Sequence, residues 1–206
     1  MWYMYHMVRR PDPETKPRLL AQAVEYVAQH GVAELSLRQL AAALGTSHRM
    51  LSYHFGSKEG LLVEVVKAVE ERQRAALADL DAELPAGHPP AELLRALWRR
   101  LADPALWPHE RLFFEMYGQA LMGNPKATPL LAGIVDSWLA PAVDLARRRG
   151  LPGRTAAADA RLALAVVRGL LLDLLATGDR AGVDAAMERF VEWYSSGWPE
   201  PTSKTS

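Results

Sequence analysis

The chain has 206 residues, 24 acidic and 24 basic side chains, and no cysteine. The lack of cysteine excludes disulfides, thiolate catalysis and cysteine-based zinc sites. Half of the residues are hydrophobic, and no segment alternates apolar and polar residues as strands do, so the sequence predicts an all-α protein. We expect it to be cytoplasmic, because its longest apolar runs, such as Leu162–Val167, are far too short to cross a membrane.

The chain begins with an arm, residues 1–14, that contains proline and charged residues and is predicted to be flexible. A first helix is expected from about residue 17 to residue 30. Its inward stripe is Leu20, Val24 and Val27, and Gly31 ends it. This helix is predicted to complete a three-helix module with the two short helices that follow.

Residues 36–58 have the pattern of two short helices joined by a turn. The first helix has one apolar stripe at helical spacing, made of Leu37, Leu40, Ala41 and Leu44. Gly45 ends it, because a helix C-cap often needs a positive φ that glycine adopts without strain. Thr46 or Ser47 then caps a second helix, which turns Leu51 and Phe55 inward. The segment carries basic residues and no acidic ones, so it predicts a DNA-binding helix-turn-helix.

The outward face of the second helix carries hydrogen-bond donors, a cation and an aromatic ring, which are the groups that read base edges and phosphates. We expect base contacts from His48, Arg49, Met50 and Tyr53. Phosphate or sugar contacts are expected from Ser36, Ser52, His54 and Lys58, and Arg38, Thr46 and Ser47 complete the predicted DNA-binding set. The alternative for His54 is that it packs against Phe55 and Leu51.

Residues 15–62 resemble the hallmark segment of the TetR family of bacterial transcription regulators. The residues that match its L-Y-x-H-F-x-S-K-E-x-L-L run are Leu51, His54, Phe55, Ser57, Lys58, Glu59, Leu61 and Leu62. One position departs from the run, since Ser52 replaces the tyrosine and an aromatic residue follows it as Tyr53. The family tyrosine contacts a backbone phosphate, and here that contact is either lost or passes to Tyr53. The resemblance implies a dimeric DNA-binding regulator whose body encloses a ligand cavity.

The predicted division is a helix-turn-helix domain at residues 15–60, an effector-binding and dimerisation domain at 61–198, and flexible termini at 1–14 and 199–206. Ser57 is expected to cap a long helix that runs to about Leu84, where a proline-rich segment breaks it. Further helices are expected at about 91–102, 108–122, 127–149, 154–177 and 180–196. Pro141 should kink or split the third of these.

Aromatic and methionine side chains gather in the first half of this body. The predicted ligand-binding residues are Trp98, Trp107, Phe113, Phe114, Glu115, Tyr117, Met122 and Trp138. Such side chains line most ligand cavities, but at helical spacing they are also ordinary core residues, and the sequence leaves both interpretations open. Glu115 and Gln119 either orient a polar group of the ligand or lie on a solvated face. A carboxylate in the wall would favour a cationic ligand.

The helix at 154–177 is apolar on almost every side, so it needs cover from more than one direction. The resemblance implies that the last two helices of each subunit form a four-helix dimer interface. The predicted interface residues are Leu162, Val166, Leu170, Leu174, Met187, Phe190 and Tyr194. Arg168 and Asp173 interrupt the apolar helix, and an ion pair or hydrogen bond at the interface is preferred to a ligand-binding role.

The sequence thus predicts a homodimeric regulator, a repressor, that binds a palindromic operator in double-stranded DNA and is released by a small, largely apolar or aromatic effector. No catalytic motif, cofactor site or metal site is expected: His109-Glu110 lacks the second histidine of a zinc metalloprotease helix. Two alternatives stay open. One is a DNA-binding protein of this fold without an effector. The other is a helical small-molecule binder or enzyme with a vestigial DNA-binding module.

Overall fold

The computed structural model describes residues 13–32, 35–85, 88–148 and 153–196. Within these ranges all regular structure is helical, as the sequence predicts. The α-helices are α1 Thr15–His30, α2 Leu37–Ala43, α3 His48–Phe55, α4 Lys58–Glu83, α5 Pro90–Leu101, α6 Trp107–Leu121, α7 Asp136–Arg148, α8 Gly153–Thr177 and α9 Arg180–Ser196. Two short 3-10 turns, Pro104–Leu106 and Thr128–Leu130, precede α6 and α7. None of the described helices is long and apolar enough to span a membrane.

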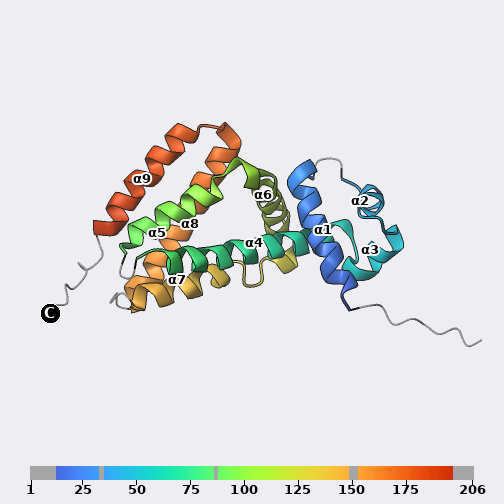
Figure 1. Ribbon diagram of the computed structural model, residues 1–206, viewed down its shortest axis with the longest axis horizontal. Helices are drawn as coiled ribbons and strands as arrows, with labels where there is room; N and C mark the ends of the chain where they lie inside the picture. The colour runs from blue at the N-terminus through green and yellow to red at the C-terminus, as the bar shows by residue number, and fades with distance from the viewer. Residues whose placement is uncertain (1–12, 33–34, 86–87, 149–152, 197–206) are drawn as a thin grey trace, which may run out of the picture.

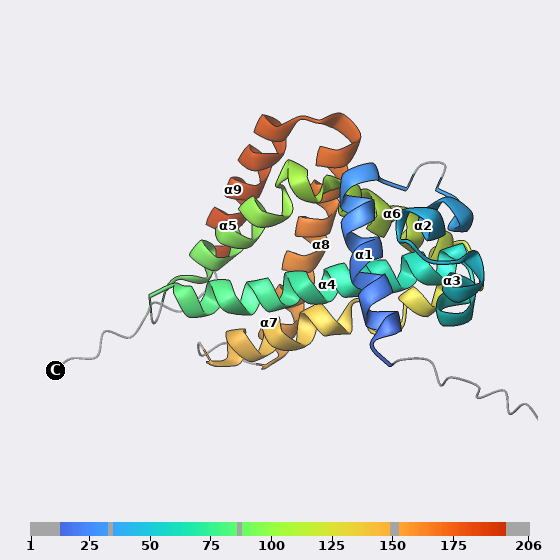
Figure 2. The ribbon, with the colours of Figure 1, turned by 45° about the vertical axis from the view of Figure 1, so that its right-hand side comes forward.

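The molecule is elongated, with a small head at one end and a larger body at the other (Figure 1). The head consists of α1, α2 and α3, and the body contains α5 to α9. Helix α4 leaves the head and runs along the body, where it packs against α5 and α6. Helix α6 lies between α5 and α1 in Figure 1, in agreement with its contacts to α1 and α4, and the view turned by 45° shows α1 crossing α4 (Figure 2).

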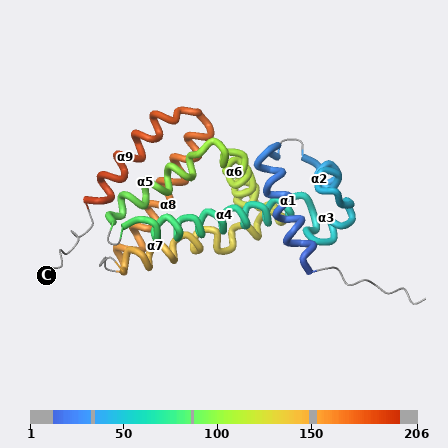
Figure 3. The backbone as a smooth tube through the Cα atoms, viewed as in Figure 1, coloured from blue at the N-terminus to red at the C-terminus, as the bar shows by residue number. Residues whose placement is uncertain are grey.

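Two clusters of buried apolar side chains hold these parts together. The first joins the head to α4 and α6, and its most enclosed members include Leu51, Leu61 and Met116. The second joins α5, α8 and α9 around Trp98, Leu174 and Met187. The smooth trace shows the same arrangement, with α5 lying between α4 and α9 (Figure 3). The head therefore shares a core with the helices that lead into the body.

One expected helix has different bounds. The predicted helix at 127–149 begins only at Asp136, after a 3-10 turn and a bend in which Gly133 has a φ of 75°. The start predicted for this helix is therefore wrong, because a positive φ interrupts the helical path. Pro141 does not split α7, which continues through it. The arm residues 1–12 and the tail residues 197–206, predicted to be flexible, lie outside the described residues.

The junction between α3 and α4 depends on a close approach at Gly60. A Cβ atom on this residue would lie 2.3 Å from the carbonyl oxygen of Phe55. That oxygen belongs to backbone, so it has no flexible end that could move aside. Gly56 ends α3 with a φ of 75°, and the Ser57 hydroxyl accepts a hydrogen bond from the Gly60 amide at 3.1 Å. Helix α4 therefore begins against the last turn of α3.

Candidate DNA-binding surface and ligand cavity

Side-chain caps at the N-terminal ends of both helices hold α2 and α3 in place. The Ser36 hydroxyl accepts from the Gln39 amide at 3.2 Å, and the Gln39 side chain accepts from the Ser36 amide at 2.9 Å, a reciprocal capping box. Ser47 caps α3 by accepting from the Met50 amide at 3.1 Å. Gly45 in the turn has a φ of 62°. These local bonds fix the start of α3, which is the helix expected to enter the major groove.

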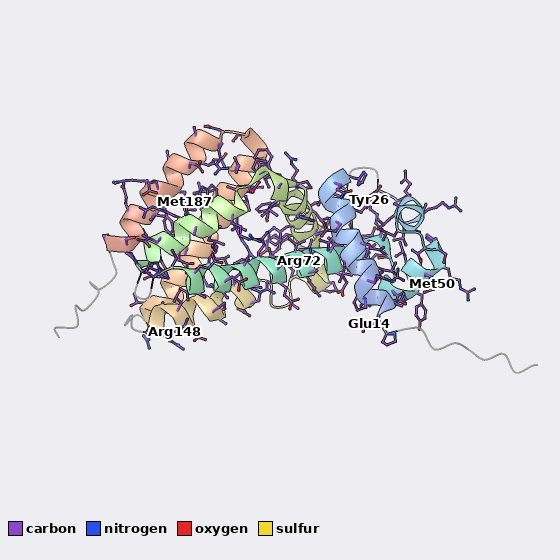
Figure 4. The ribbon with its side chains drawn as sticks, viewed as in Figure 1. Glu14, Tyr26, Met50, Arg72, Arg148 and Met187 are labelled. Carbon is purple, nitrogen blue, oxygen red and sulfur yellow. The ribbon has the colours of Figure 1, made fainter. Side chains whose placement is uncertain are left out.

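The residues predicted to read bases lie on the open side of α3. His48, Arg49 and Tyr53 are exposed, and Met50 is half-buried. Figure 4 shows Met50 near the outer end of the head, away from the body. Tyr53 is 66% exposed, so most of this large aromatic side chain is open to contact with another molecule. The opposite side of α3 buries Leu51 and Phe55 in the head core.

The residues predicted to touch phosphates have more varied surroundings. Ser36 and Arg38 are exposed, and Ser52 and Lys58 are half-buried. Of the remaining predicted contacts, Thr46 is half-buried and Ser47 is exposed. His54 packs edge-on against the ring of Tyr53 at 5.0 Å, and its Nε2 atom is buried without a hydrogen-bond partner among the described residues. The His54 ring also lies 6.3 Å from that of Phe55, one of the two residues named in the packing alternative, and the phosphate contact stays a prediction.

The body contains a cavity of about 260 Å³ enclosed by α4, α5, α6, α7, α8 and α9. This volume is just below the range of roughly 300–1,000 Å³ that is usual for small-molecule sites. Most of the wall is apolar, and its leucines and aromatic rings include Leu97, Phe113, Phe114 and Trp138. Size, enclosure and chemistry are those of a site for a small, mainly apolar molecule.

A cluster of charged side chains interrupts this apolar wall. The Trp138 indole donates to the Glu70 carboxylate at 2.5 Å, and a guanidinium nitrogen of Arg168 lies 3.6 Å from the same carboxylate. Arg168 also donates to the Ile134 carbonyl oxygen at 3.1 Å and stacks over the Phe113 ring at 5.0 Å. Burial raises the pKa of Glu70, while Trp138 and Arg168 oppose the rise. Glu70 and Arg168 are thus a partnered pair of buried groups.

Glu110 is the second buried acid of the cavity wall, with an exposed fraction of 5%. Burial raises the pKa of its carboxyl group to about 8, with a further rise from the neighbouring Glu70 and a smaller opposing effect of Arg168. No hydrogen bond or ion pair to the Glu110 carboxyl group is made by the described residues. No three acidic or histidine side chains in the described ranges are grouped to hold a metal ion.

Three of the eight predicted ligand-binding residues line this cavity: Phe113, Phe114 and Trp138. The other five lie elsewhere. Trp98 is buried and donates to Asp184 at 2.6 Å, and Trp107 donates to the Ala102 carbonyl oxygen at 3.3 Å. Tyr117 stacks on Phe113 behind the wall, with ring centroids 5.4 Å apart.

The remaining two, Glu115 and Met122, face solvent. Met122 is 88% exposed, and Glu115 is exposed and accepts from the Gln119 side chain at 3.2 Å. Glu115 is therefore not a carboxylate of the cavity. The acids that line it are Glu70, Glu110 and Asp81, and Asp81 is paired with His88 at 2.9 Å.

Arg168 forms the kind of ion pair and hydrogen bond that were expected of it, with Glu70 and the Ile134 carbonyl oxygen, but they lie in the cavity wall of the single chain. The sequence contained a signal for the buried charges. Glu70 follows Leu62 and Val66 at four-residue steps on the buried side of α4, and Glu110 precedes Phe113 and Phe114 by three and four. A charged residue in step with an apolar stripe marks a buried charge.

The predicted interface residues of α8 and α9 divide between two faces. Leu174 and Met187 are fully enclosed in the core of the single chain, and Leu162 is 38% exposed. Val166, Leu170, Phe190 and Tyr194 are half-buried. The outer face of α8 instead carries a continuous row of small and apolar residues at helical spacing: Ala158, Leu162, Ala165, Gly169, Leu172 and Ala176, all of them exposed.

The fold and the open face of α3 define a helix-turn-helix protein with a helical body that encloses a cavity. Residues 19–65 match the sequence profile of the bacterial regulatory proteins of the tetR family. The helix-turn-helix segment of this chain is therefore that of the TetR family of transcriptional regulators, and the fold supports a DNA-binding regulator. None of the curated proteins matches it.

Solved structures share the fold along nearly the whole chain. A transcriptional regulator from Rhodococcus sp. Rha1 superposes with a TM-score of 0.70 at 21% identity, covering 89% of this chain and 97% of that chain. The multidrug binding protein EbrR, solved with imidazole, gives 0.61 at 27% identity, covering 96% and 97%. A protein from Saccharomonospora viridis in complex with choline gives 0.65 at 22% identity, covering 90% and 97%.

Proposed function

We propose that the protein is a repressor that binds a palindromic operator as a homodimer and is released by a small, largely apolar or aromatic effector in the α4–α9 cavity. Residues 15–60 are assigned to DNA binding, and residues 61–198 to effector binding and dimerisation. As a regulator of DNA it would act in the cytoplasm, and we assign it no catalytic activity.

The observation that carries the proposal is the continuity of α4 from the reading head to the cavity. Its first turn lies against the end of α3 at Gly60, and its middle supplies Glu70, Arg74 and Leu77 to the cavity wall. Glu70 lies only about 15 Å along the helix from Gly60, at 1.5 Å per residue. A ligand that displaces the wall at Glu70 therefore acts on the same rigid element that positions α3.

The dimer is supported by the exposed row on α8 and by Trp193 of α9, which is 60% exposed. Small residues such as Gly169 let two helices approach closely, and a Cβ atom on Gly169 would meet nothing within 4 Å in the single chain. A contiguous apolar surface of this kind marks an interaction site. Two copies related by a two-fold axis would present two α3 helices to successive major grooves, about 34 Å apart.

Support for a small-molecule effector comes from the cavity and from the relatives. EbrR is described as a multidrug binding protein and was solved with imidazole, and the Saccharomonospora viridis protein was solved with choline. These ligands belong to those proteins. Both proteins were solved with a small nitrogen-containing molecule, which together with the apolar cavity here supports an occupant of similar size.

The test begins with selection of DNA fragments that the purified protein retains, followed by sequencing. We expect an enriched inverted repeat bound by two chains. Small aromatic molecules, neutral and charged, are then titrated against the protein–operator complex while tryptophan emission is recorded. Because Trp138 lies in the cavity wall, an effector should quench emission and release the operator over one concentration range.

The alternatives give different outcomes. Unchanged operator affinity across the panel, together with specific DNA binding, identifies a regulator without an effector. Retention of no preferred DNA sequence, together with tight ligand binding, identifies a helical binder or enzyme with a vestigial head.

A further inference from the structure

Among the described residues, some charged groups in the cavity wall are paired with other protein groups and one is not. The unpaired group determines which ligand charge the cavity favours. Glu70 accepts from Trp138 and lies beside Arg168. The guanidinium of Arg168 donates to a backbone carbonyl and lies over two aromatic rings, those of Phe113 and Tyr117. Each of these groups is therefore compensated within the protein. Glu110 is the exception.

The Glu110 carboxyl group lies in the cavity wall at 5% exposure, with no hydrogen bond from the described residues. A buried carboxylate without a partner is costly, so the group keeps its proton instead. Burial raises the pKa of Glu110 to about 8, and the adjacent Glu70 adds to this effect. The empty cavity is thus lined by a neutral acid that a positive charge would ionise.

Resting on the proposed function, we propose that the effector carries a positively charged nitrogen that pairs with Glu110, on an apolar or aromatic frame that fills the remaining cavity. Two acids, Glu70 and Glu110, lie on the same side of the wall. The wall also contains the rings of Phe113, Phe114, Trp138 and Tyr194, and aromatic faces attract cations: Arg168 and Arg74 already lie over the Phe113 and Trp138 rings. Charge and ring chemistry therefore favour the same class of ligand.

The arginines of the wall are the argument for an anionic ligand, and their placement disfavours it. Arg168 is engaged with Glu70, Ile134 and two rings. Arg74 lies over the Trp138 ring at 5.9 Å and lowers the pKa of Glu70. Arg148 is exposed and lies at the far end of the body from the head (Figure 4). An anion would have to displace one of these interactions while it lay beside Glu70 and Glu110.

The pairing has a consequence for protons. Below pH 8, a ligand of fixed positive charge must displace the Glu110 proton, and binding releases up to one proton per ligand. The affinity for such a ligand should then rise with pH, by at most about tenfold per unit, and level off above pH 8. Among the charged groups near Glu110, Glu70 opposes this ionisation and Arg168 favours it, and neither removes the proton exchange.

The test uses phenyltrimethylammonium, its uncharged carbon isostere tert-butylbenzene, and phenylacetate as the anion. Calorimetry at pH 6.5 in two buffers with different heats of ionisation gives the protons released by the full-length protein. We expect the cation to bind with release of close to one proton. We expect Glu110→Gln to abolish the release and weaken the cation by at least about tenfold, about 1.4 kcal/mol. Binding of tert-butylbenzene should change by less than about threefold.

The matched control is Glu115→Gln, the same chemical change on an exposed residue of the same helix, and it should alter neither the affinity nor the proton release. If Glu110→Gln fails to fold, the proton release of the unaltered protein decides alone. The inference is overturned if the cation binds without proton release, if it does not bind up to millimolar concentration, or if phenylacetate binds more tightly. A phenylacetate-bound protein that releases operator would overturn this inference and leave the proposed function standing. If the cation binds with proton release but the operator complex stays intact, this inference stands and the proposed function is overturned.

Discussion

The imidazole of His109 on α6 donates from Nε2 to the carbonyl oxygen of Val24 on α1, at 3.0 Å. Its Nδ1 atom is buried without a partner in the described part of the chain. The next residue along α6 is Glu110, which faces the cavity. Adjacent positions of one helix thus touch the ligand site and the head, which gives the body a second connection to the DNA-binding module beside α4.

This relationship predicts that His109→Leu separates effector binding from operator release. Leucine fills a similar volume but donates no hydrogen bond, so α6 loses its polar link to α1. Tryptophan quenching by an effector should persist, while the effector concentration that releases the operator rises by about threefold, a loss of about 0.7 kcal/mol of coupling. His109→Gln, whose amide also donates, is the control and should behave nearly as the unaltered protein.

Base reading by α3 predicts that Arg49→Ala loses about 1–3 kcal/mol of operator affinity and relaxes the preference at one base pair. Lys58→Ala should instead weaken all DNA sequences alike and reduce the salt slope of binding by about one. Fluorescence anisotropy over a series of salt concentrations measures both. The control is Arg99→Ala, which removes an exposed arginine of the body. Intact specificity in Arg49→Ala would refute the assignment of α3 as the recognition helix.

The exposed row on α8 predicts that Leu172→Arg gives monomers. Leu172 is 50% exposed in the single chain, so the fold of each chain should survive while a hydrophobic interface would have to bury a charge. Light scattering should report half the mass, and operator binding should be lost. Leu121→Arg makes the same change at a leucine that is 64% exposed at the end of α6, and it should leave the mass unchanged. If the unaltered protein is a monomer at micromolar concentration, the prediction is wrong.

The raised pKa of Glu110 predicts a pH-dependent stability. The folded protein holds this proton up to about pH 8, whereas the unfolded chain releases it near the ordinary value of 4.5. The stabilising effect of the protonated acid is therefore present below pH 4.5 and is lost as the pH rises toward 8, by at most about 1.4 kcal/mol per unit. Glu110→Gln keeps a neutral side chain and so escapes this loss. From pH 5 to pH 8, the free energy of unfolding of the variant should therefore rise relative to that of the unaltered protein. Denaturant unfolding measures the difference, and parallel curves would contradict it.

Local signals made the head predictable. Ser47, Gly45 and the Leu51–Phe55 pair determine caps, turn and inward face within a few residues of one another, and the structure places them as expected. The body was predictable as helices but not as a site, because the cavity depends on how α4, α6 and α8 cross. In the sequence, Trp98 and Trp138 are both tryptophans within predicted helices and look alike. In the structure, Trp98 donates a hydrogen bond to Asp184 in the core, and Trp138 donates one to Glu70 in the cavity wall.

The close approach of Gly60 to the Phe55 carbonyl oxygen makes the α3–α4 junction tightly packed, so we expect α3 and α4 to move together there. The atom that a Cβ on Gly60 would meet first is a backbone oxygen, which cannot move aside by a change of rotamer. A tilt of α4 by about 5° shifts its axis at Glu70 by roughly 1.3 Å, at 1.5 Å rise per residue. If α3 moves together with α4, the tilt displaces α3 as well. In a two-fold symmetric dimer, the distance between the two α3 helices would then change by twice the displacement of one. Under the proposed function, the absent Cβ atom of Gly60 is thus what would let a small molecule in the cavity change the separation of the two α3 helices of a dimer.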